Sequence, residues 1–283
     1  MIKEHITIIK PNKSWLYINW KELFQYRDLL FLLVRRDFVA RYKQTILGPL
    51  WFILQPLATT IVFTVIFNKV ANISTDTLPP MLFYLSGIIM WKYFSDCLGR
   101  TSTSLTANAG IFGKVYFPRL IVPFSALISN LFGFFIQWVT FLGFVIFFNY
   151  FTSVGTSIQP NYFILFTPFY LLHAAGIGLG VGLWLSALTA KYKDFTYLMG
   201  FFTQLWMYGS PIIYPISLVS DKWKPFVMLN PIAPIIELFR YSYLGQGTLH
   251  LPYLLISLAV TFVLLVSGVL VFNKSERTFI DTF

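Results

Sequence analysis

The amino-acid sequence predicts an all-α protein that crosses a membrane six times. Of its 283 residues, 57% are hydrophobic and only 11% are charged, whereas a soluble domain normally carries about 25% charged residues. Several long stretches contain no charged residue at all, and each is long enough for a helix of the roughly 20 apolar residues that a bilayer requires. A soluble globular enzyme is therefore excluded.

Charge-free stretches place the spans along the chain. The interval from Arg119 to Lys191 contains no charged residue and is long enough for two helices, which a polar run with a glycine and a proline separates at residues 149–161. The other spans lie in shorter intervals, and the second is the only one that carries charged side chains within its length. In chain order, the predicted spans are residues 47–67, 81–100, 121–148, 162–190, 195–214 and 252–272.

The distribution of Lys and Arg orients these spans. With the N-terminus on the cytoplasmic side, sixteen Lys and Arg flank the spans on that side and four on the other. Because cytoplasmic loops of membrane proteins are enriched in basic residues, both termini are predicted to be cytoplasmic. The chain then divides into a cytoplasmic N-terminal segment (1–46), a transmembrane domain (47–273) and a cytoplasmic tail (274–283).

Before the first span, residues 20–43 predict an amphipathic helix at the membrane surface. Apolar side chains recur at spacings of three or four residues and form one face of the helix, and charged side chains form the other. Such a helix serves either as a basic anchor on anionic headgroups or as a docking surface for a cytoplasmic partner, and the two roles are compatible. The residues that define the pattern are Leu23, Leu30, Val34, Phe38 and Tyr42 on the apolar side and Arg35, Arg36, Asp37 and Arg41 on the polar side.

Two further segments do not fit a simple bundle. The connection at 101–123 is long for a cytoplasmic loop and mixes aromatic and basic residues around Gly110 and Gly113, so it is either a solvated turn or a short helix presented to a partner. Residues 210–252 are apolar but interrupted by six prolines. Because non-helical backbone at membrane depth must be buried in protein or line a cavity, short re-entrant or interfacial helices on the outer side are predicted there.

Within the spans, two patterns predict specific contacts. Lys92, Asp96 and Arg100 recur every four residues on one face of the second span. Either they face a partner or an aqueous path, or Asp96 and Arg100 lie at the membrane interface and the Lys92 side chain extends to it. In the fourth span, glycines at positions 176, 178, 180 and 182 form two overlapping GxxxG pairs, which allow neighbouring helices to approach closely. His173, alone in the same span, is expected to be a hydrogen-bonded packing residue.

The motifs of several enzyme classes are absent from the sequence. It contains no Gly-x-x-x-x-Gly-Lys-Ser/Thr string, so this chain does not hydrolyse ATP by that route. Three histidines and a single cysteine, Cys97, are too dispersed for a zinc site. Asp96 and Glu237 are the only carboxylates near membrane depth, and no pattern pairs them as acid and base. No cofactor of its own, no catalytic residue and no nucleic-acid partner are therefore expected.

A string at the start of the first span carries a resemblance to a known family: Arg36-Asp37-x-x-x-Arg41-Tyr42-x-Gln44-Thr45-x-Leu47-Gly48-x-x-Trp51, followed by Gln55-Pro56-Leu57. It resembles the opening of the membrane subunits of polysaccharide-export ABC transporters, which include the O-antigen, capsular-polysaccharide and teichoic-acid exporters. Shorter motifs continue the resemblance in the same order along the chain, with Lys193 where the family pattern has Arg: Lys114-x-x-Phe117-Pro118-Arg119, Lys193-Asp194-Phe195, Ser210-Pro211-Ile212-x-Tyr214-Pro215, Asn230-Pro231 and Phe239-Arg240.

The resemblance implies a homodimer of six-helix subunits in a bacterial inner membrane, paired with two copies of a separate ATP-binding subunit that holds ATP and Mg²⁺. The N-terminal helix and the 101–123 connection would then couple the chain to that ATPase, and residues 210–251 would form a periplasmic cap. The coupling residues that this implies are Gly110, Phe112, Lys114, Tyr116, Phe117 and Arg119.

The implied substrate is a polysaccharide attached to a polyprenyl diphosphate, most simply of the O-antigen type. A diphosphate needs cations near its entrance, and sugars stack on aromatic rings, although the same residue types also anchor and pack ordinary membrane helices. The entrance cations that we expect are Arg36, Arg41, Lys43 and Arg100. The expected channel-lining rings are Trp51, Phe52, Tyr84, Trp91, Phe124, Phe132, Phe135 and Trp138.

Three alternatives remain open from the sequence. An exporter of teichoic acid or of a small lipid or drug would use the same type of subunit. A membrane enzyme that modifies glycans would depend on Asp96 and Glu237. A passive channel would need no ATPase, but no ring of acidic or hydroxyl residues for ion selectivity is apparent.

Overall fold

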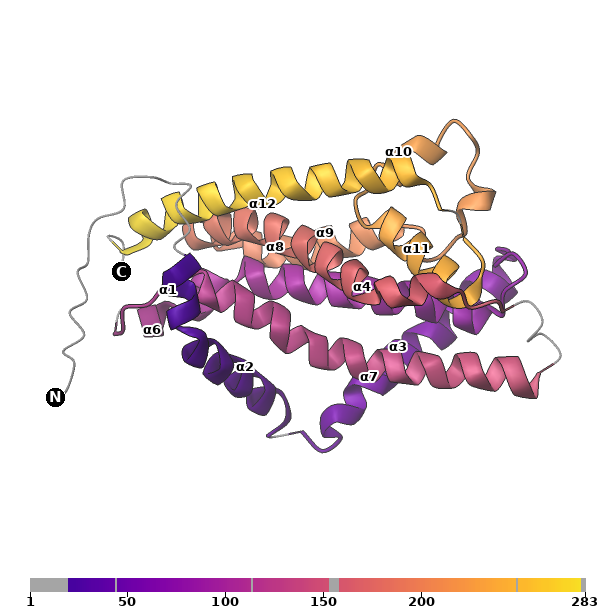
Figure 1. Ribbon diagram of the computed structural model, residues 1–283, viewed down its shortest axis with the longest axis horizontal. Coiled ribbons are helices and arrows are strands. Elements are labelled where there is room, and N and C mark those ends of the chain that lie inside the picture. Colours follow the sequence, from indigo (N-terminus) through magenta and orange to yellow (C-terminus); the bar gives the residue numbers. More distant parts are fainter. Residues whose placement is uncertain (1–19, 44, 113, 153–157, 248, 281–283) are drawn as a thin grey trace.

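The computed structural model is all-helical over the residues that it describes, which are all except 1–19, 44, 113, 153–157, 248 and 281–283. Long helices lie side by side along the longest axis of the molecule (Figure 1). The α-helices are α1 (Trp20–Gln25), α2 (Arg27–Tyr42), α3 (Trp51–Phe63), α4 (Pro80–Ser102), α5 (Ser104–Ala107), α6 (Ala109–Phe112), α7 (Ile121–Phe151), α8 (Thr167–Lys191), α9 (Asp194–Tyr208), α10 (Lys224–Met228), α11 (Ala233–Leu244) and α12 (Leu251–Ile280). Short turns of other helix types are η1 (Gly48–Leu50), η2 (Thr64–Val70), η4 (Tyr162–Phe166) and η5 (Ile216–Leu218).

Within the described residues, four helical segments are long and apolar enough to cross a membrane. They are Gly48–Val70, Ile121–Phe151, Tyr162–Lys191 and Leu251–Glu276. These segments correspond to the first, third, fourth and sixth spans predicted from the charge-free stretches. The chain is therefore a membrane protein. Each of the four segments has at least the roughly 20 residues that a helix needs to cross a bilayer.

The structure does not confirm the other two predicted spans. The second corresponds to α4, which has 23 residues but carries Lys92, Asp96 and Arg100, and most of its side chains are buried in the bundle. A helix surrounded by protein does not need the apolar surface of a lipid-facing helix. The fifth corresponds to α9, which has only 15 residues and is therefore about 22 Å long.

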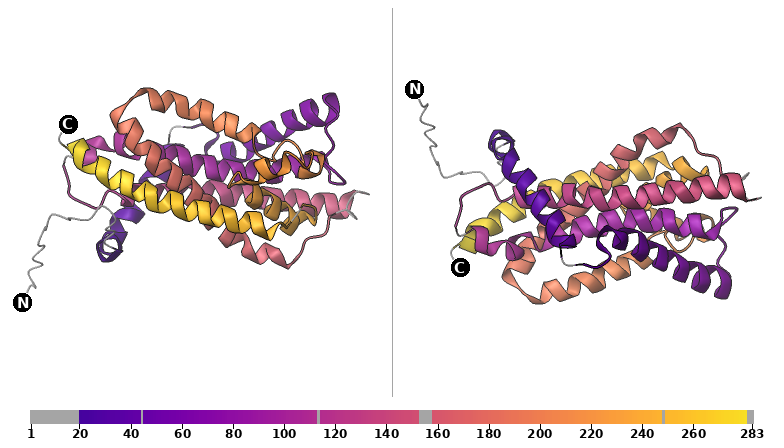
Figure 2. Two further views of the ribbon diagram at one scale, coloured as in Figure 1. Left: turned by 90° about the horizontal axis from the view of Figure 1, so that it is seen from above. Right: turned by 90° about the horizontal axis from the view of Figure 1, so that it is seen from below.

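The predicted end of the fifth span, at residue 214, is wrong. Helix α9 ends at Tyr208 and is followed by Gly209, Ser210 and Pro211. Proline has no backbone N–H for the helical hydrogen bond and its ring clashes with the preceding turn, so Pro211 disfavours continuation of the helix. Figure 2 shows α9 along one edge of the bundle, where most of its side chains are exposed.

The N-terminal helix is also broken where the sequence predicts continuity. Residues 20–43 form α1 and α2, which Tyr26 separates with φ −88° and ψ 19°. Helix α2 then lies obliquely against α7 (Figure 1). The end of the molecule that carries α1 also carries α6 and the C-terminal turns of α12, whereas α10 and α11 lie near the opposite end.

Helix α8 is the centre of the bundle and packs against both α4 and α12. A Cβ atom added at Gly180 would lie 2.9 Å from the Leu264 backbone of α12, and one added at Gly182 would lie 2.5 Å from Cβ of Thr101 in α4. The other members of the pairs, Gly176 and Gly178, face α12 and α4 in the same alternation. The prediction that these glycines allow close helix contact is confirmed.

Candidate functional site: a cationic cavity beside the N-terminal helices

Helix α2 is held by an apolar face that packs on the start of α7 and on the segment before it. Leu33 of α2 is buried in one cluster with Phe117, Ile121 and Val122, and the side chains of α1 and Phe112 pack around this cluster. Side chains three and four residues apart share a helix face. Arg36 and Asp37 therefore lie on the same side of α2 as the buried Leu33, one turn further along, where they face α4 and α5. The N-terminal helices and the 101–123 connection therefore form one packed unit.

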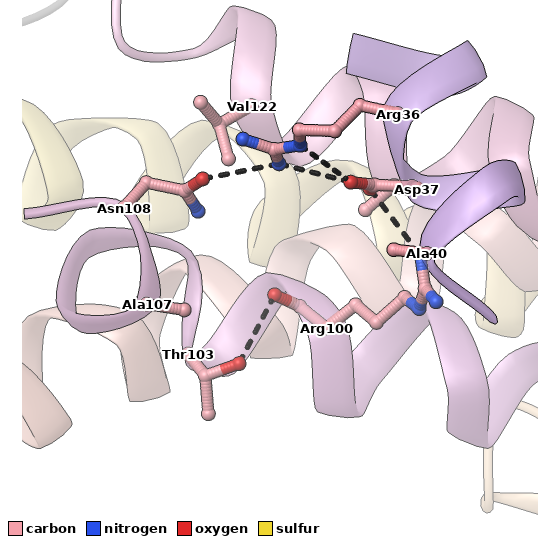
Figure 3. A pocket seen from close by; sticks show the side chains of 9 residues that line it. Arg36, Asp37, Ala40, Arg100, Thr103, Ala107, Asn108 and Val122 are labelled. Atoms are coloured by element: carbon pink, nitrogen blue, oxygen red, sulfur yellow. Dashed lines mark hydrogen bonds and ion pairs between the residues drawn. The ribbon is translucent and has the colours of Figure 1, made fainter. Parts of the chain in front are cut away.

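A cavity of about 370 Å³ lies where α2, α4, α5 and α7 meet. Its charged residues are Arg36 and Asp37 of α2 and Arg100 of α4, and Figure 3 shows their side chains pointing toward one another. The remaining lining residues are small or of moderate size: Ala40, Thr103, Ala107, Asn108, Val122 and Ala126. The structure thus brings Arg36 and Arg100, two of the four predicted entrance cations, into one site.

The two arginines share one carboxylate. Arg36 donates from Nε and Nη2 to Oδ1 of Asp37, at 3.0 and 2.9 Å, and Arg100 donates from Nη1 to Oδ2 at 3.4 Å. Arg36 Nη2 also donates to Oδ1 of Asn108 at 3.2 Å. The site therefore holds two positive charges against one negative charge. Hydrogen bonds from arginine to carboxylate or phosphate oxygens are among the strong ones in proteins.

The other two predicted entrance cations are not part of the cavity lining. Lys43 is exposed just beyond the end of α2. Arg41 belongs to α2, but its side chain is outside the described part of the structure. Gln44 and Gly113 are outside the described residues altogether.

The predicted coupling residues separate into an exposed and a buried group. Gly110, Lys114 and Tyr116 are exposed around α6, and Phe112 is partly buried. Phe117 and Arg119 are buried. Of the two alternatives that the sequence left open for this connection, the structure has short helices, since α5 and α6 both lie within it.

Arg119 links this connection to the last helix. Its Nη1 donates to the backbone carbonyl of Glu276 at 3.0 Å, its Nε lies 3.5 Å from Oε1 of Glu276, and its guanidinium lies over the Phe112 ring. Burial lowers the pKa of Arg119, and the carboxylate of Glu276 acts in the opposite direction. Arg119 is therefore an internal brace between the connection and α12.

The predicted channel-lining rings also divide by exposure. Trp51, Phe132 and Phe135 are exposed, Phe52, Phe124 and Trp138 are partly buried, and Tyr84 and Trp91 are buried in the core of the bundle. Tyr84 packs edge to face on Phe63, and Trp91 packs on Phe94 and Trp206. Within this chain these two rings pack against protein and leave no face for a passing sugar.

Two of the rings line a second, mainly apolar cavity of about 420 Å³ between α7, α8 and α11. Phe135 and Trp138 contribute from α7, and Tyr243 contributes from α11. The indole N–H of Trp138 donates to the Tyr243 hydroxyl at 2.8 Å, and that hydroxyl lies 2.6 Å from Oγ1 of Thr167.

Sequence reasoning missed the role of Arg240 of α11, which the structure buries near the end of the bundle opposite α1 and α6. Its Nη1 donates to Oε1 of Glu237 at 2.9 Å and to the carbonyl of Pro211 at 2.6 Å, and its guanidinium stacks on Phe83 at 3.7 Å. It therefore fastens α11 and the loop after α9 to α4. The signal lay in the sequence, because Pro211 and Arg240 belong to two of the motifs that carry the resemblance.

Asp96 and Glu237, the two carboxylates on which a membrane enzyme would depend, each form an ion pair within this chain. Glu237 pairs with Arg240, and Asp96 pairs with Lys92 at 2.8 Å, as the spacing of these residues on one helix face predicts. The described residues contain no group of three or more His, Cys, Asp or Glu that could hold a metal ion. This arrangement favours structural over catalytic roles for both carboxylates.

Comparison with known proteins agrees with this architecture. The sequence model of the ABC-2 type transporter family matches residues 28–244. The O-antigen export system permease protein RfbA of Myxococcus xanthus is 25% identical over 93% of this chain and 98% of its own length, and RfbA of Klebsiella pneumoniae is 25% identical over 90% and 94%. The capsule polysaccharide export inner-membrane protein CtrC of Neisseria meningitidis serogroup B is 22% identical over 91% and 95%. The match covers α2 to α11, and thus the cationic cavity and the Arg240 contacts, so the chain belongs to the ABC-2 type transporter family.

Proposed function

We propose that the chain is the transmembrane subunit of an ATP-driven exporter that moves polyprenyl-diphosphate-linked polysaccharide, of the O-antigen type, across a bacterial inner membrane. The observation that carries this proposal is the cationic cavity, where Arg36 and Arg100 converge at the end of the bundle that holds α1 and α6. Two arginines are suited to a diphosphate, because each guanidinium offers a planar set of N–H donors to phosphate oxygens.

The curated relatives support the same class of cargo. Those named for O-antigen export and those named for capsule export match this chain over almost their whole length. A capsular polysaccharide is therefore the second candidate cargo. Two RfbA proteins are more similar to this chain than CtrC is, which favours the O-antigen type.

The proposed assembly is a homodimer with two copies of a separate ATP-binding subunit, and each chain crosses the membrane six times with both termini in the cytoplasm. Residues 1–46 and 101–123 meet the ATPase, 210–251 cap the periplasmic side, and 274–283 form the cytoplasmic tail. ATP and Mg²⁺ bind to the partner subunit, because this sequence lacks a phosphate-binding loop.

Coupling in this proposal depends on the packed unit of α1, α2 and the 101–123 connection. The ATPase pushes on the exposed side chains around α6, chiefly Lys114 and Tyr116. Phe117 transmits the motion to α2 through their common apolar cluster, and Arg119 transmits it to α12. The motion of α2 moves Arg36 directly, because Arg36 belongs to that helix. It reaches Arg100 through Asp37, the carboxylate that both arginines share.

The aromatic rings that remain exposed on α3 and α7 are the proposed path for the sugar. Trp51, Phe132 and Phe135 can present a ring face to the C–H surface of a sugar. Phe52 supports this surface, because its ring packs directly on Gly133 of α7.

Purification of the chain with its native membrane-associated proteins tests the proposal. We expect a protein with a phosphate-binding loop to co-purify in nearly equal amount, and we expect its ATPase activity and surface glycan to fall in a Lys114→Glu variant. Lys222→Glu is the matched control, because Lys222 is also exposed but belongs to the proposed cap. A chain that purifies alone, or equal loss in both variants, would contradict the proposal.

A further inference from the structure

The cationic cavity contains its own anion. Asp37 accepts from Arg36 on its own helix and from Arg100 on α4, and only 19% of its side chain is exposed, against 41% for Arg36 and 27% for Arg100. The contact with Arg100 joins the N-terminal interface helix to a helix of the bundle. It is therefore an interhelical tie as well as a neutralising contact.

Asp37 does not fill the space around it. The cavity of about 370 Å³ is lined otherwise by small side chains, and a single water molecule takes up about 30 Å³. A phosphoryl group offers the same kind of charged oxygen acceptors as a carboxylate, and more of them. It would therefore compete with Asp37 for the same guanidinium N–H groups.

Asn108 connects the cavity to the coupling segment. It accepts from Arg36 with Oδ1 and donates with Nδ2 to the Ser104 carbonyl at 3.0 Å, and it directly precedes α6. The Ser104 hydroxyl lies 3.1 Å from the Ser186 hydroxyl of α8. A shift of the Arg36 guanidinium therefore changes a hydrogen bond to the turn between α5 and α6.

We propose that Asp37 is an internal counter-ion that holds the empty entrance closed, and that a phosphoryl group of the lipid-linked substrate displaces it. Displacement releases α2 from α4, and Asn108 passes the change to α5 and α6, where the ATPase docks. Substrate occupancy and ATPase activity are thus linked through two positioning residues. The inference rests on the proposed function, and it adds the regulation of that site.

The direction of the coupling follows from the competition. A ligand shifts a conformational equilibrium only by its difference in affinity for the two states. Because the phosphoryl group binds the arginines only when Asp37 has left them, it favours the released state. Removal of the carboxylate therefore produces part of the same change without any ligand.

The test uses the complete transporter with its ATPase in lipid nanodiscs, with polyprenyl diphosphate as the probe and polyprenol of equal length as the comparison. In an Asp37→Asn variant we expect the affinity for polyprenyl diphosphate to rise about fivefold or more, at the lower end of ordinary coupling energies. We also expect higher basal ATPase activity and weaker stimulation by the probe. Unchanged or weaker affinity would overturn the counter-ion role.

Two further variants separate this role from a general effect of charge. Asp221→Asn removes a carboxylate whose side chain is 95% exposed and which belongs to the proposed cap, away from both the entrance and the ATPase, and it is expected to change neither affinity nor basal activity. Asn108→Ala is expected to keep the affinity for the probe but to lose most of the stimulation. Full stimulation in that variant would overturn the relay. Asp37→Ser replaces Asp37→Asn if the latter does not assemble.

The wild-type measurement distinguishes failure of this inference from failure of the proposed function. If the wild-type transporter binds polyprenyl diphosphate no better than polyprenol, the entrance site itself is wrong. If it discriminates between the two lipids and Asp37→Asn behaves as wild type, only the counter-ion is wrong.

Discussion

At the scale of single residues, the arginines of this chain divide into two kinds by what surrounds them. Arg36 and Arg100 line a cavity with half-exposed side chains and share one carboxylate. Arg119 and Arg240 are buried and bonded to backbone carbonyls of other helices and loops. The first kind can exchange its partner for a ligand, whereas the second holds elements together.

The buried pair of Arg240 and Glu237 gives the sharpest test at this scale. Arg240→Leu leaves the Glu237 carboxylate buried without its cation and removes the hydrogen bonds to the loop after α9. We expect a loss of about 3–5 kcal/mol in the free energy of unfolding, measured from denaturation of the purified protein in detergent.

Two comparisons make that result specific. Adding Glu237→Gln to Arg240→Leu is expected to recover part of the loss, because the uncompensated carboxylate at this site is then replaced by a neutral amide. Lys224→Leu, which breaks an exposed pair with Asp221, is expected to leave the stability unchanged. If Arg240→Leu is as stable as the wild type, the guanidinium does not fasten α11 to α4.

At this scale the sequence predicts the partner of a residue only where both residues lie on one face of the same helix. The spacing of Lys92 and Asp96 fixes their contact, since both lie on one helix face. The same spacing places Arg100 next to Asp96 on this helix face, but the Arg100 side chain instead donates to Asp37, 63 positions away in the sequence. Contacts between distant segments depend on helix packing, which local spacing does not determine.

At the scale of elements, the packing of α8 depends on alternating glycines that bring two neighbours close. Gly176 and Gly180 face α12, whereas Gly178 and Gly182 face α4. Small side chains allow the backbones of membrane helices to approach, and dispersion contacts then replace contacts with lipid. The same helix holds His173, whose Nε2 lies within 3.1 Å of the Ser257 and Thr261 hydroxyls of α12, as expected for a packing residue.

Substitution of one of these glycines tests the role of the close contact. Gly180→Ala places a methyl group against the backbone of Leu264 and Leu265, and overpacking of this kind costs about 1–3 kcal/mol. Gly143→Ala in α7 is the control, because an added Cβ there meets no atom within 4 Å and alanine favours the helix. Thermal denaturation in mild detergent compares the two, and equal midpoints would contradict the packing role.

Element boundaries were the part of the fold that the sequence predicted least well. A span is recognised by its lack of charge, but its end is set by backbone hydrogen bonding. Residues 209–214 are mainly apolar, like the helix before them, yet the helix ends at Tyr208, and Pro211 disfavours its continuation. Similarly, nothing in the apolar pattern of residues 20–43 marks the break at Tyr26.

At the scale of the whole molecule, the number of spans depends on two helices of opposite character. Helix α4 is long but buried and carries Lys92, Asp96 and Arg100, and α9 is uncharged after Asp194 but short and mostly exposed. Length and composition identify four spans among the residues that the structure describes, because those segments are both long and apolar. Six spans require that each of these two helices connect opposite sides of the membrane. The number of spans can therefore be determined from the side on which the loops at their ends lie.

Single introduced cysteines can report the side on which each loop lies, because the natural Cys97 is fully buried and should not react with a membrane-impermeant maleimide. For α4, cysteines at Asp76 and Thr106 are expected to react from opposite sides in right-side-out and inside-out vesicles. For α9, cysteines at Lys193 and Ser220 are expected to do the same, with Ser220 on the side of Asp76.

The pattern of labelling distinguishes the alternatives. If Asp76 and Thr106 react from the same side, α4 does not span the membrane. If Lys193 and Ser220 do so, α9 is a surface helix. In either case alone the chain has five spans, so its two ends must lie on opposite sides and only one can reach a cytoplasmic ATPase. Since α1, α6 and the end of α12 lie at one end of the bundle, we expect both helices to cross.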